Sequence, residues 1–254
     1  MAATAVRSDA SARDSIPGAE AEVMINTRLT DDVPDILDIH IPVVDRSVAL
    51  VEKLARRELT PDAYMAAVRS LHEELDLPNS LKPWIERTLQ EKKDIVVYQR
   101  TRQTHREAIQ FFYLAPNVFH PPHCHHNILS TQLVLRGQAH VREFDRIARL
   151  GPDTLLLKLR LDGWLGPGEA MRATEIERNC HWFASGDEPC VMLNFNAYGY
   201  QDWTFNPKDR PLRRNLVDPT HGRNGDGLII AKEISVDESY AKFGGRPLSD
   251  FPMA

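Results

Sequence analysis

The spacing of apolar residues between about positions 43 and 91 predicts helices. Apolar side chains recur there three and four residues apart, which places them on one helical face: Val44, Val48, Leu50, Val51, Leu54 and Ala55. The segment Thr60-Pro61-Asp62 then offers an N-cap, a proline at the first helical position and an early acid. We therefore expect a second helix over about residues 61–75 and a third over 81–89.

Beyond Lys92 the pattern changes to short segments rich in β-branched and aromatic residues, separated by turns. The expected strands are Asp94–Arg100, Ile109–Leu114, Thr131–Leu135, His140–Phe144, Thr154–Leu159, Ala170–Ile176 and Cys190–Asn196. Many short strands in succession predict a mainly β sandwich or barrel. After Tyr200 the chain is rich in proline, arginine and glycine, so we expect irregular structure wrapped on the core, with one strand near Gly227–Ile234.

Composition narrows the class of protein. The chain has 254 residues, of which 42% are apolar and 26% charged, which is typical of a soluble globular protein. A net charge of −5 gives no excess of lysine and arginine, so we expect no nucleic-acid partner. The apolar runs have the length of strands, and the first fifteen residues lack the apolar stretch of a secretory signal. We expect a cytoplasmic protein with no membrane segment, and a disordered arm at residues 1–20.

Three cysteines, Cys124, Cys180 and Cys190, are an odd number in a long chain, which does not suit a disulfide framework. We expect reduced, half-buried thiols.

The histidines carry the strongest chemical signal. Six of the ten lie between positions 105 and 140. Prolines exclude a helix from His120-Pro121-Pro122-His123-Cys124-His125-His126, so side chains there alternate between two faces of an extended chain. His123 and His125 then share one face, where their nitrogens could bind one divalent ion. The alternative is that both are turn residues facing solvent. We expect His120 and His126 at the surface or the rim of the site, and Cys124 on the opposite face.

The stretch from His123 to Gly137 resembles the first conserved motif of the cupin superfamily. That motif has two histidines flanking one residue, four residues, a glutamate, six residues and a glycine. The spacing is kept here, with Ser130 in place of the glutamate. Residues 176–189 resemble the second motif, whose single histidine corresponds to His181 and whose usual proline and glycine are replaced by Ile176 and Arg178. The resemblance covers about residues 95–200.

The resemblance implies a cupin double-stranded β-helix, a jelly-roll barrel, with a mononuclear metal held by His123, His125 and His181. Because a hydroxyl is a poor ligand at neutral pH, Ser130 leaves a neutral triad. A similar loss of the glutamate occurs in the cysteine dioxygenase and diketone-cleaving branches, which use iron(II) and dioxygen. Gln132, on the same face as Ser130, could supply its amide oxygen in place of the glutamate, or form a hydrogen bond beside the metal ligands.

Further residues near these motifs are candidates for the site. His140 and Tyr198 are candidates for acid–base help, although His140 could equally be a residue of the barrel wall. Arg142 and Arg172 could clamp a substrate carboxylate or form surface salt bridges. Trp182 could line the substrate pocket or pack in the core.

Together these features predict a non-haem iron(II) oxygenase acting on a small polar substrate that chelates the metal beside O2. The alternatives are a redox-neutral lyase or isomerase that uses zinc, manganese or nickel, and a non-catalytic binder. We expect a helical segment at 21–93, the cupin barrel at 94–204 and a C-terminal extension at 205–254. The flanking segments would suit a contact in a homodimer.

Overall fold

The computed structural model describes residues 41–101, 106–201 and 213–253; the arm expected at residues 1–20 lies outside these ranges. Within them the N-terminal helices are α2 (Pro42–Ala55), α3 (Pro61–Glu74), α4 (Leu77–Ser80) and α5 (Lys82–Glu91). The Thr60 hydroxyl accepts a hydrogen bond from the backbone N–H of Ala63 at 3.2 Å, which confirms the predicted N-cap. None of the helices in these ranges has the length and apolar character needed to cross a membrane.

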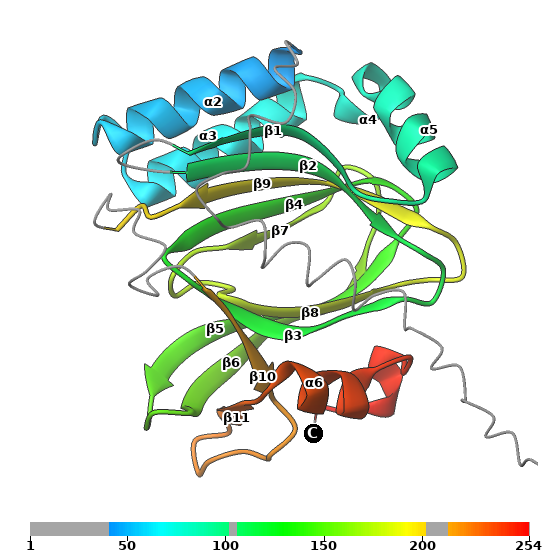
Figure 1. Cartoon of the computed structure of the whole chain (residues 1–254). Helices are drawn as coiled ribbons and strands as arrows, with labels where there is room; N and C mark the ends of the chain where they lie inside the picture. The colour runs from blue at the N-terminus through cyan, green and yellow to red at the C-terminus, as the bar shows by residue number, and fades with distance from the viewer. Residues whose placement is uncertain (1–40, 102–105, 202–212, 254) are drawn as a thin grey trace, which may run out of the picture. The chain divides into compact units, whose positions relative to one another are not determined.

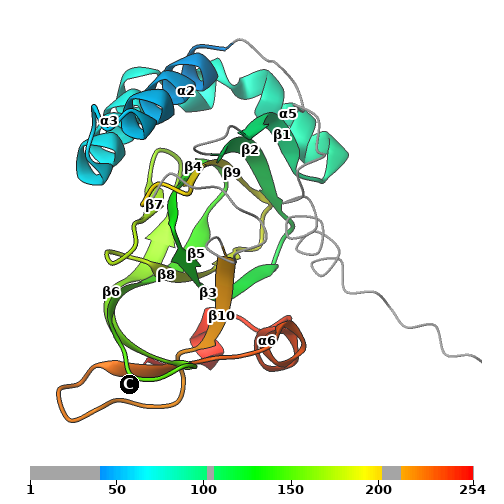
Figure 2. The ribbon, with the colours of Figure 1, turned by 60° about the vertical axis from the view of Figure 1, so that its left-hand side comes forward.

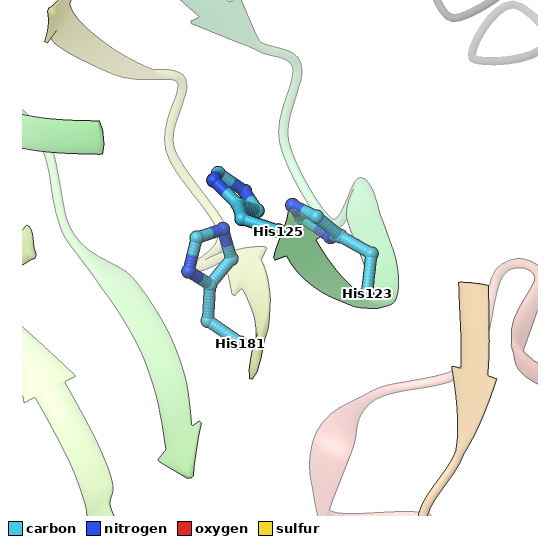
Figure 3. Close-up of side chains that lie close together, drawn as sticks. All are labelled: His123, His125 and His181. Atoms are coloured by element: carbon cyan, nitrogen blue, oxygen red, sulfur yellow. The ribbon is translucent and has the colours of Figure 1, made fainter. Parts of the chain in front are cut away.

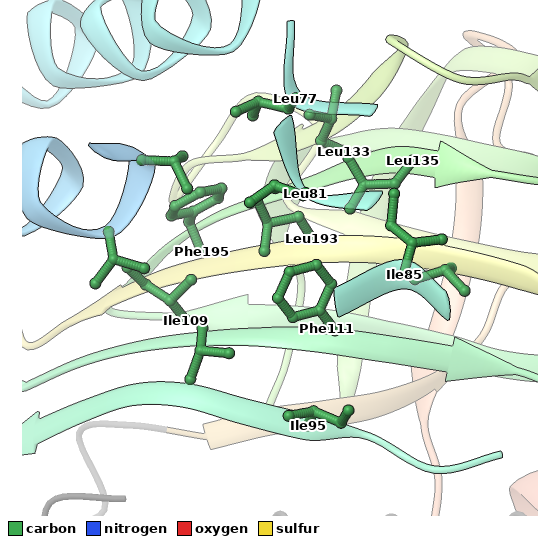
Figure 4. Close-up of a cluster of buried hydrophobic side chains, with 14 of the residues drawn as sticks. Leu77, Leu81, Ile85, Ile95, Ile109, Phe111, Leu133, Leu135, Leu193 and Phe195 are labelled. Atoms are coloured by element: carbon green, nitrogen blue, oxygen red, sulfur yellow. The ribbon is translucent and has the colours of Figure 1, made fainter. Parts of the chain in front are cut away.

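The helices cover one face of a five-stranded sheet (Figure 1). Its strands, in spatial order, are β1 (Ile95–Thr101), β2 (Arg106–Leu114), β9 (Cys190–Tyr198), β4 (Ile128–Arg136) and β7 (Ala170–Ala173). Leu133, Leu193 and Phe195 on the covered face form a core with Leu77, Leu81 and Ile85 of the helical segment (Figure 4). Because side chains alternate along a strand, the even-numbered residues of β4 and β9 lie on the opposite face.

A second set of strands closes into a six-stranded barrel. In spatial order these are β10 (Arg213–Asp218), β11 (Ile229–Glu233), β6 (Thr154–Leu165), β5 (Ala139–Arg149), β8 (Cys180–Ser185) and β3 (Phe119–His126). Figure 2 shows β10 beside β3, with the curved β6 on the far side of the barrel. The helix α6 (Val236–Phe243) and a 3-10 turn at Leu248–Asp250 pack beside Trp182 of β8.

The C-terminal segment is more regular than expected. The predicted strand near Gly227–Ile234 is confirmed as β11, but β10 and α6 were not predicted. Since β10 joins β3 to β11, residues after 205 complete the barrel wall. The expected domain boundaries stay a prediction.

The interior of the six-stranded barrel is an apolar core with at least one residue from every strand: Cys124, Phe144, Leu155, Leu157, Cys180, Val217, Ile229 and Ala231. The expectation of reduced thiols was wrong for two of the cysteines, because Cys124 and Cys180 form a disulfide. They are directly opposite one another in the pairing of β3 with β8. Cys190 is free and buried. Both cysteines point away from the face that carries the histidines, as expected for Cys124.

Gly137 makes the turn between β4 and β5, at the position where the first motif has its glycine. Its φ is +75°, a conformation that side chains disfavour. An added Cβ atom would lie 2.3 Å from the backbone oxygen of Pro189. Only glycine therefore allows this close approach of the two turns.

Candidate metal centre

Three histidines from two adjacent strands meet on one face of the barrel wall (Figure 3). One ligand atom from each of His123, His125 and His181 lies within 4.8 Å of the other two. The ring centroids of His123 and His181 are 4.3 Å apart, and those of His125 and His181 are 4.8 Å apart. All three side chains are at most 1% exposed. The structure thus brings together the three residues that the cupin resemblance implies as metal ligands.

The histidines lie between the barrel wall and the five-stranded sheet, not in the interior of the six-stranded barrel. The ring of Phe112, on an even-numbered position of β2, is 5.8 Å from that of His120 and 6.3 Å from that of Phe183. The five-stranded sheet has one face covered by the helices. These contacts show that its other face packs against the histidine face of β3 and β8. The disulfide and its apolar core are on the other side of the same wall.

Local geometry orients the first ligand. Pro121 and Pro122 cannot donate to a neighbouring strand, and the pairing of β3 with β8 shifts its register between His120 and His123. At this irregularity in β3, the Pro121 carbonyl oxygen lies 2.9 Å from Nδ1 of His123. Because a carbonyl only accepts, Nδ1 of His123 carries the proton and Nε2 is left with the lone pair that a metal requires.

The loop before β8 sets the position of the third ligand. The Asn179 side-chain amide donates to the carbonyl oxygens of His125 at 2.9 Å and Thr174 at 2.7 Å. This fully buried side chain ties the start of β8 to the end of β3. Arg178, which replaces the usual glycine of the second motif, has a φ of +48°. The Arg178 backbone thus has the left-handed conformation that glycine accepts most readily.

A buried carboxylate shares the face of the histidines. Glu143 of β5 is directly opposite His181 in the pairing of β5 with β8, and its side chain is fully buried. It accepts a hydrogen bond from the Arg178 guanidinium at 2.6 Å and another from the backbone N–H of Arg172 at 3.2 Å. Burial raises the pKa of the Glu143 carboxyl, while Arg178 opposes that shift. Glu143 is not a member of the three-histidine group.

Two of the other predicted site residues face the histidines. Gln132 and Tyr198 occupy even-numbered positions of β4 and β9 and are buried, as is Ser130. The sequence-based prediction that Ser130 and Gln132 share a face is therefore confirmed by the register of β4.

Four other candidates lie elsewhere, so the structure does not bring them to the histidines. Arg142 and Trp182 form a cross-strand pair on the far side of the barrel wall, with the Arg142 guanidinium 5.2 Å from the indole. Arg142 also donates to the backbone oxygen of Phe251 at 2.6 Å, which holds the C-terminal segment. His140 is on that side as well, with Nε2 2.7 Å from a carboxylate oxygen of Asp162.

Arg172 is directly opposite Thr131 in the pairing of β4 with β7. It therefore lies on the helix-covered face of the five-stranded sheet, where burial lowers the pKa of His72 in α3 and the charge of Arg172 adds to that shift. The structure therefore does not bring Arg172 to the histidines, where it was considered as a clamp for a substrate carboxylate.

The two other histidines of β3, His120 and His126, lie in different environments. His126 is at the rim as expected, with Nδ1 3.0 Å from a carboxylate oxygen of Glu175. His120 was expected at the surface or the rim of the site; it is buried beside the ligands, with its ring 4.6 Å from that of His123 and stacked on Phe183 at 4.8 Å. The register shift at the two prolines turns His120 inward.

The sequence-based interpretation missed Glu143, Asn179, Asn194 and Asn196. Each is a polar residue at an inward position or a loop position whose neighbours come from a distant strand. The alternating pattern in Cys190–Tyr198 could have shown that Asn194 and Asn196 share a face, but not which face.

The donor set fits a single divalent transition-metal ion, because three buried imidazoles offer nitrogen ligands without any carboxylate. The site and its framework define a mainly β protein with two facing layers of strands, N-terminal helices and a possible three-histidine metal centre. The fold class that the cupin resemblance implies is thereby confirmed.

No protein-family model matches the chain, and no curated protein matches it. Among solved structures it is similar to an 11S globulin from Wrightia tinctoria, at 14% identity and a TM-score of 0.31 over 43% of this chain and 22% of that one. It is also similar to an uncharacterized conserved protein with a double-stranded beta-helix domain from Klebsiella pneumoniae, at 17% identity and a TM-score of 0.30 over 42% of this chain and 74% of that one. The chain thus spans less than a quarter of the length of that globulin.

Proposed function

We propose that this protein is a mononuclear iron(II) oxygenase acting on a small polar substrate that chelates the metal. The observation that carries the proposal is the buried group of His123, His125 and His181 with no carboxylate among its members. Three neutral ligands would leave the full charge of a divalent ion to polarise a bound substrate. They also leave several coordination positions free.

The chain's own groups would hold and shield the reacting molecules. The hydrogen bond between His123 and Pro121 fixes one imidazole, and Asn179 fixes the spacing between the two strands that supply the ligands. Iron(II), when bound, would supply open positions for the chelating substrate and for dioxygen. Phe112 and Phe183 exclude water on one side of the histidines.

A redox-neutral lyase or isomerase is the second candidate, and Glu143 favours it. A buried carboxylate directly across from His181 could accept a proton from a molecule bound at the histidines and return it to that molecule. In that reaction zinc, manganese or nickel would stabilise an enolate-like charge and oxygen would not be consumed.

Metal analysis of anaerobically purified protein tests the proposal, followed by oxygen-electrode traces with iron(II) and candidate thiols, diketones and hydroxy-aromatics. We expect about one iron per chain and oxygen uptake that depends on substrate. Zinc, manganese or nickel without uptake would favour the lyase or isomerase, and absence of bound metal would refute both.

Substitution tests the ligand assignment. His123→Ala, His125→Ala and His181→Ala should each abolish stoichiometric metal binding. The matched control is His126→Ala, which removes a histidine from the same strand that points to Glu175 instead. Loss of metal in His126→Ala but not in His123→Ala would show that the ligand set is wrong.

A further inference from the structure

Two cross-strand pairs of polar side chains lie on the face of the five-stranded sheet that points away from the helices. Ser130 of β4 is directly opposite Asn196 of β9, and Gln132 is directly opposite Asn194. All four side chains are at most 4% exposed. Hydroxyl and amide groups thus form a continuous polar surface, here called the amide surface, on the face that looks onto the histidines.

The amide surface contains hydrogen-bond acceptors that no other described residue of the protein uses. Ser130 Oγ, Gln132 Oε1, Asn194 Oδ1 and Asn196 Oδ1 are buried and have no hydrogen-bond partner among the residues that the structure describes. Buried polar atoms are nearly always paired in folded proteins, because an unpaired one loses its hydration without compensation. Four such atoms side by side indicate a surface built for a molecule that supplies the missing partners.

The surface is also neutral. The described side chains on this face of β2, β4 and β9, at the even-numbered positions 108–112, 128–134 and 192–198, carry no charge. The two arginines considered as carboxylate clamps lie elsewhere: Arg142 is on the far side of the barrel wall and Arg172 is on the helix-covered face. Amides and hydroxyls both donate and accept, which matches the hydroxyl groups of a neutral ligand.

We propose that the amide surface binds the neutral, hydroxyl-bearing part of a substrate whose other end chelates the metal. The proposal rests on the proposed metal-dependent function and names its substrate class, a small polyhydroxylated carbonyl compound. An anionic tail would meet unpaired oxygens with no compensating positive charge from this surface, and an apolar tail would leave those oxygens unpaired.

Three five-carbon hydroxyketones with the same chelating head test the preference. D-xylulose has a hydroxylated tail, 1-hydroxypentan-2-one an apolar tail and 5-hydroxy-4-oxopentanoate a carboxylate tail. Calorimetric titration under anaerobic conditions, on metal-loaded and on metal-free protein, gives the three affinities. We expect D-xylulose to bind at least about tenfold more tightly than the other two, as one or two additional hydrogen bonds would give. Equal affinities, or tightest binding of the carboxylate, would overturn the proposal.

Two near-isosteric substitutions separate a binding role from a structural one. Asn194→Leu and Gln132→Met should each weaken D-xylulose binding about tenfold and leave the affinity for 1-hydroxypentan-2-one unchanged. They should keep the metal content, and they should not lower the melting temperature, because each removes a buried oxygen that has no partner. Thr131→Val is the matched control, since Thr131 is equally buried on the same strand but faces the helices.

A fall in melting temperature without any change in D-xylulose binding would assign these residues a structural role and refute the inference. Failure of the metal proposal gives a different result. Suppose that no metal binds, but that metal-free protein still prefers D-xylulose and that Asn194→Leu abolishes this preference. That result would support the proposal for the amide surface and refute the proposed metal-dependent function.

Discussion

Asn179 offers a test of how the fold controls the metal centre without touching a ligand side chain. In Asn179→Ala the two donors to the carbonyl oxygens of His125 and Thr174 disappear; these hydrogen bonds have donor–acceptor distances of 2.9 and 2.7 Å. Alanine cannot replace them, and the fully buried position limits the access of water. The substitution therefore leaves two main-chain acceptors without their partner.

The magnitude follows from the cost of an unsatisfied buried acceptor. At about 1–3 kcal/mol for each of the two carbonyls, the free energy of unfolding should fall by roughly 2–6 kcal/mol. Because Asn179 links the end of β3 to the start of β8, the spacing between His125 and His181 should also loosen. Loss of an outer hydrogen bond of this kind typically weakens metal binding by about 10–100-fold.

Two measurements on the same variant separate these effects. Urea unfolding of metal-free protein gives the stability, and competition with a chromophoric chelator gives the metal affinity. Asn224→Ala is the control, because the Asn224 side chain accepts from the backbone N–H groups of Asp226 and Leu228 in a remote loop. If Asn179→Ala lost stability but kept its metal affinity within about threefold, as Asn224→Ala should, the reasoning on strand spacing would be refuted.

Three further predictions concern stability. Burial lowers the pKa of His72 from 6.5 to about 4. The contribution of neutral His72 to the free energy of unfolding should therefore be complete above pH 6.5 and be lost as the pH falls towards 4. The loss between pH 7 and pH 5 should be about 2 kcal/mol, and urea titrations should find it absent in His72→Leu. Cys124→Ala opens the disulfide to Cys180, which closes a separation of 56 residues, and should cost about 4 kcal/mol. Wild type treated with a dithiol reductant should melt like that variant, and equal melting before and after reduction would contradict this. Gly137→Ala places a Cβ atom 2.3 Å from the Pro189 oxygen, and should lower the free energy of unfolding by more than about 2 kcal/mol.

Local patterns in the sequence were sufficient for much of the fold. Apolar spacing predicted the helices between residues 43 and 91, and most strands between 94 and 196 were predicted near their observed positions. These succeed because helix and strand periodicities depend on neighbours only a few residues apart. Alternation also predicted that His123 and His125 share a face and that Cys124 points the other way. The motif spacing added His181, which lies far away in the sequence.

Tertiary structure decided which faces meet. The disulfide between Cys124 and Cys180, the approach of Glu143 to His181 and the pairing of Gln132 with Asn194 all depend on the register between strands that are distant in the sequence. A shift of one residue in any register would turn each of these side chains to the opposite face. Periodicity within one strand states which side chains share a face, but only the packing of one sheet on another determines whether that face lines a site or a core.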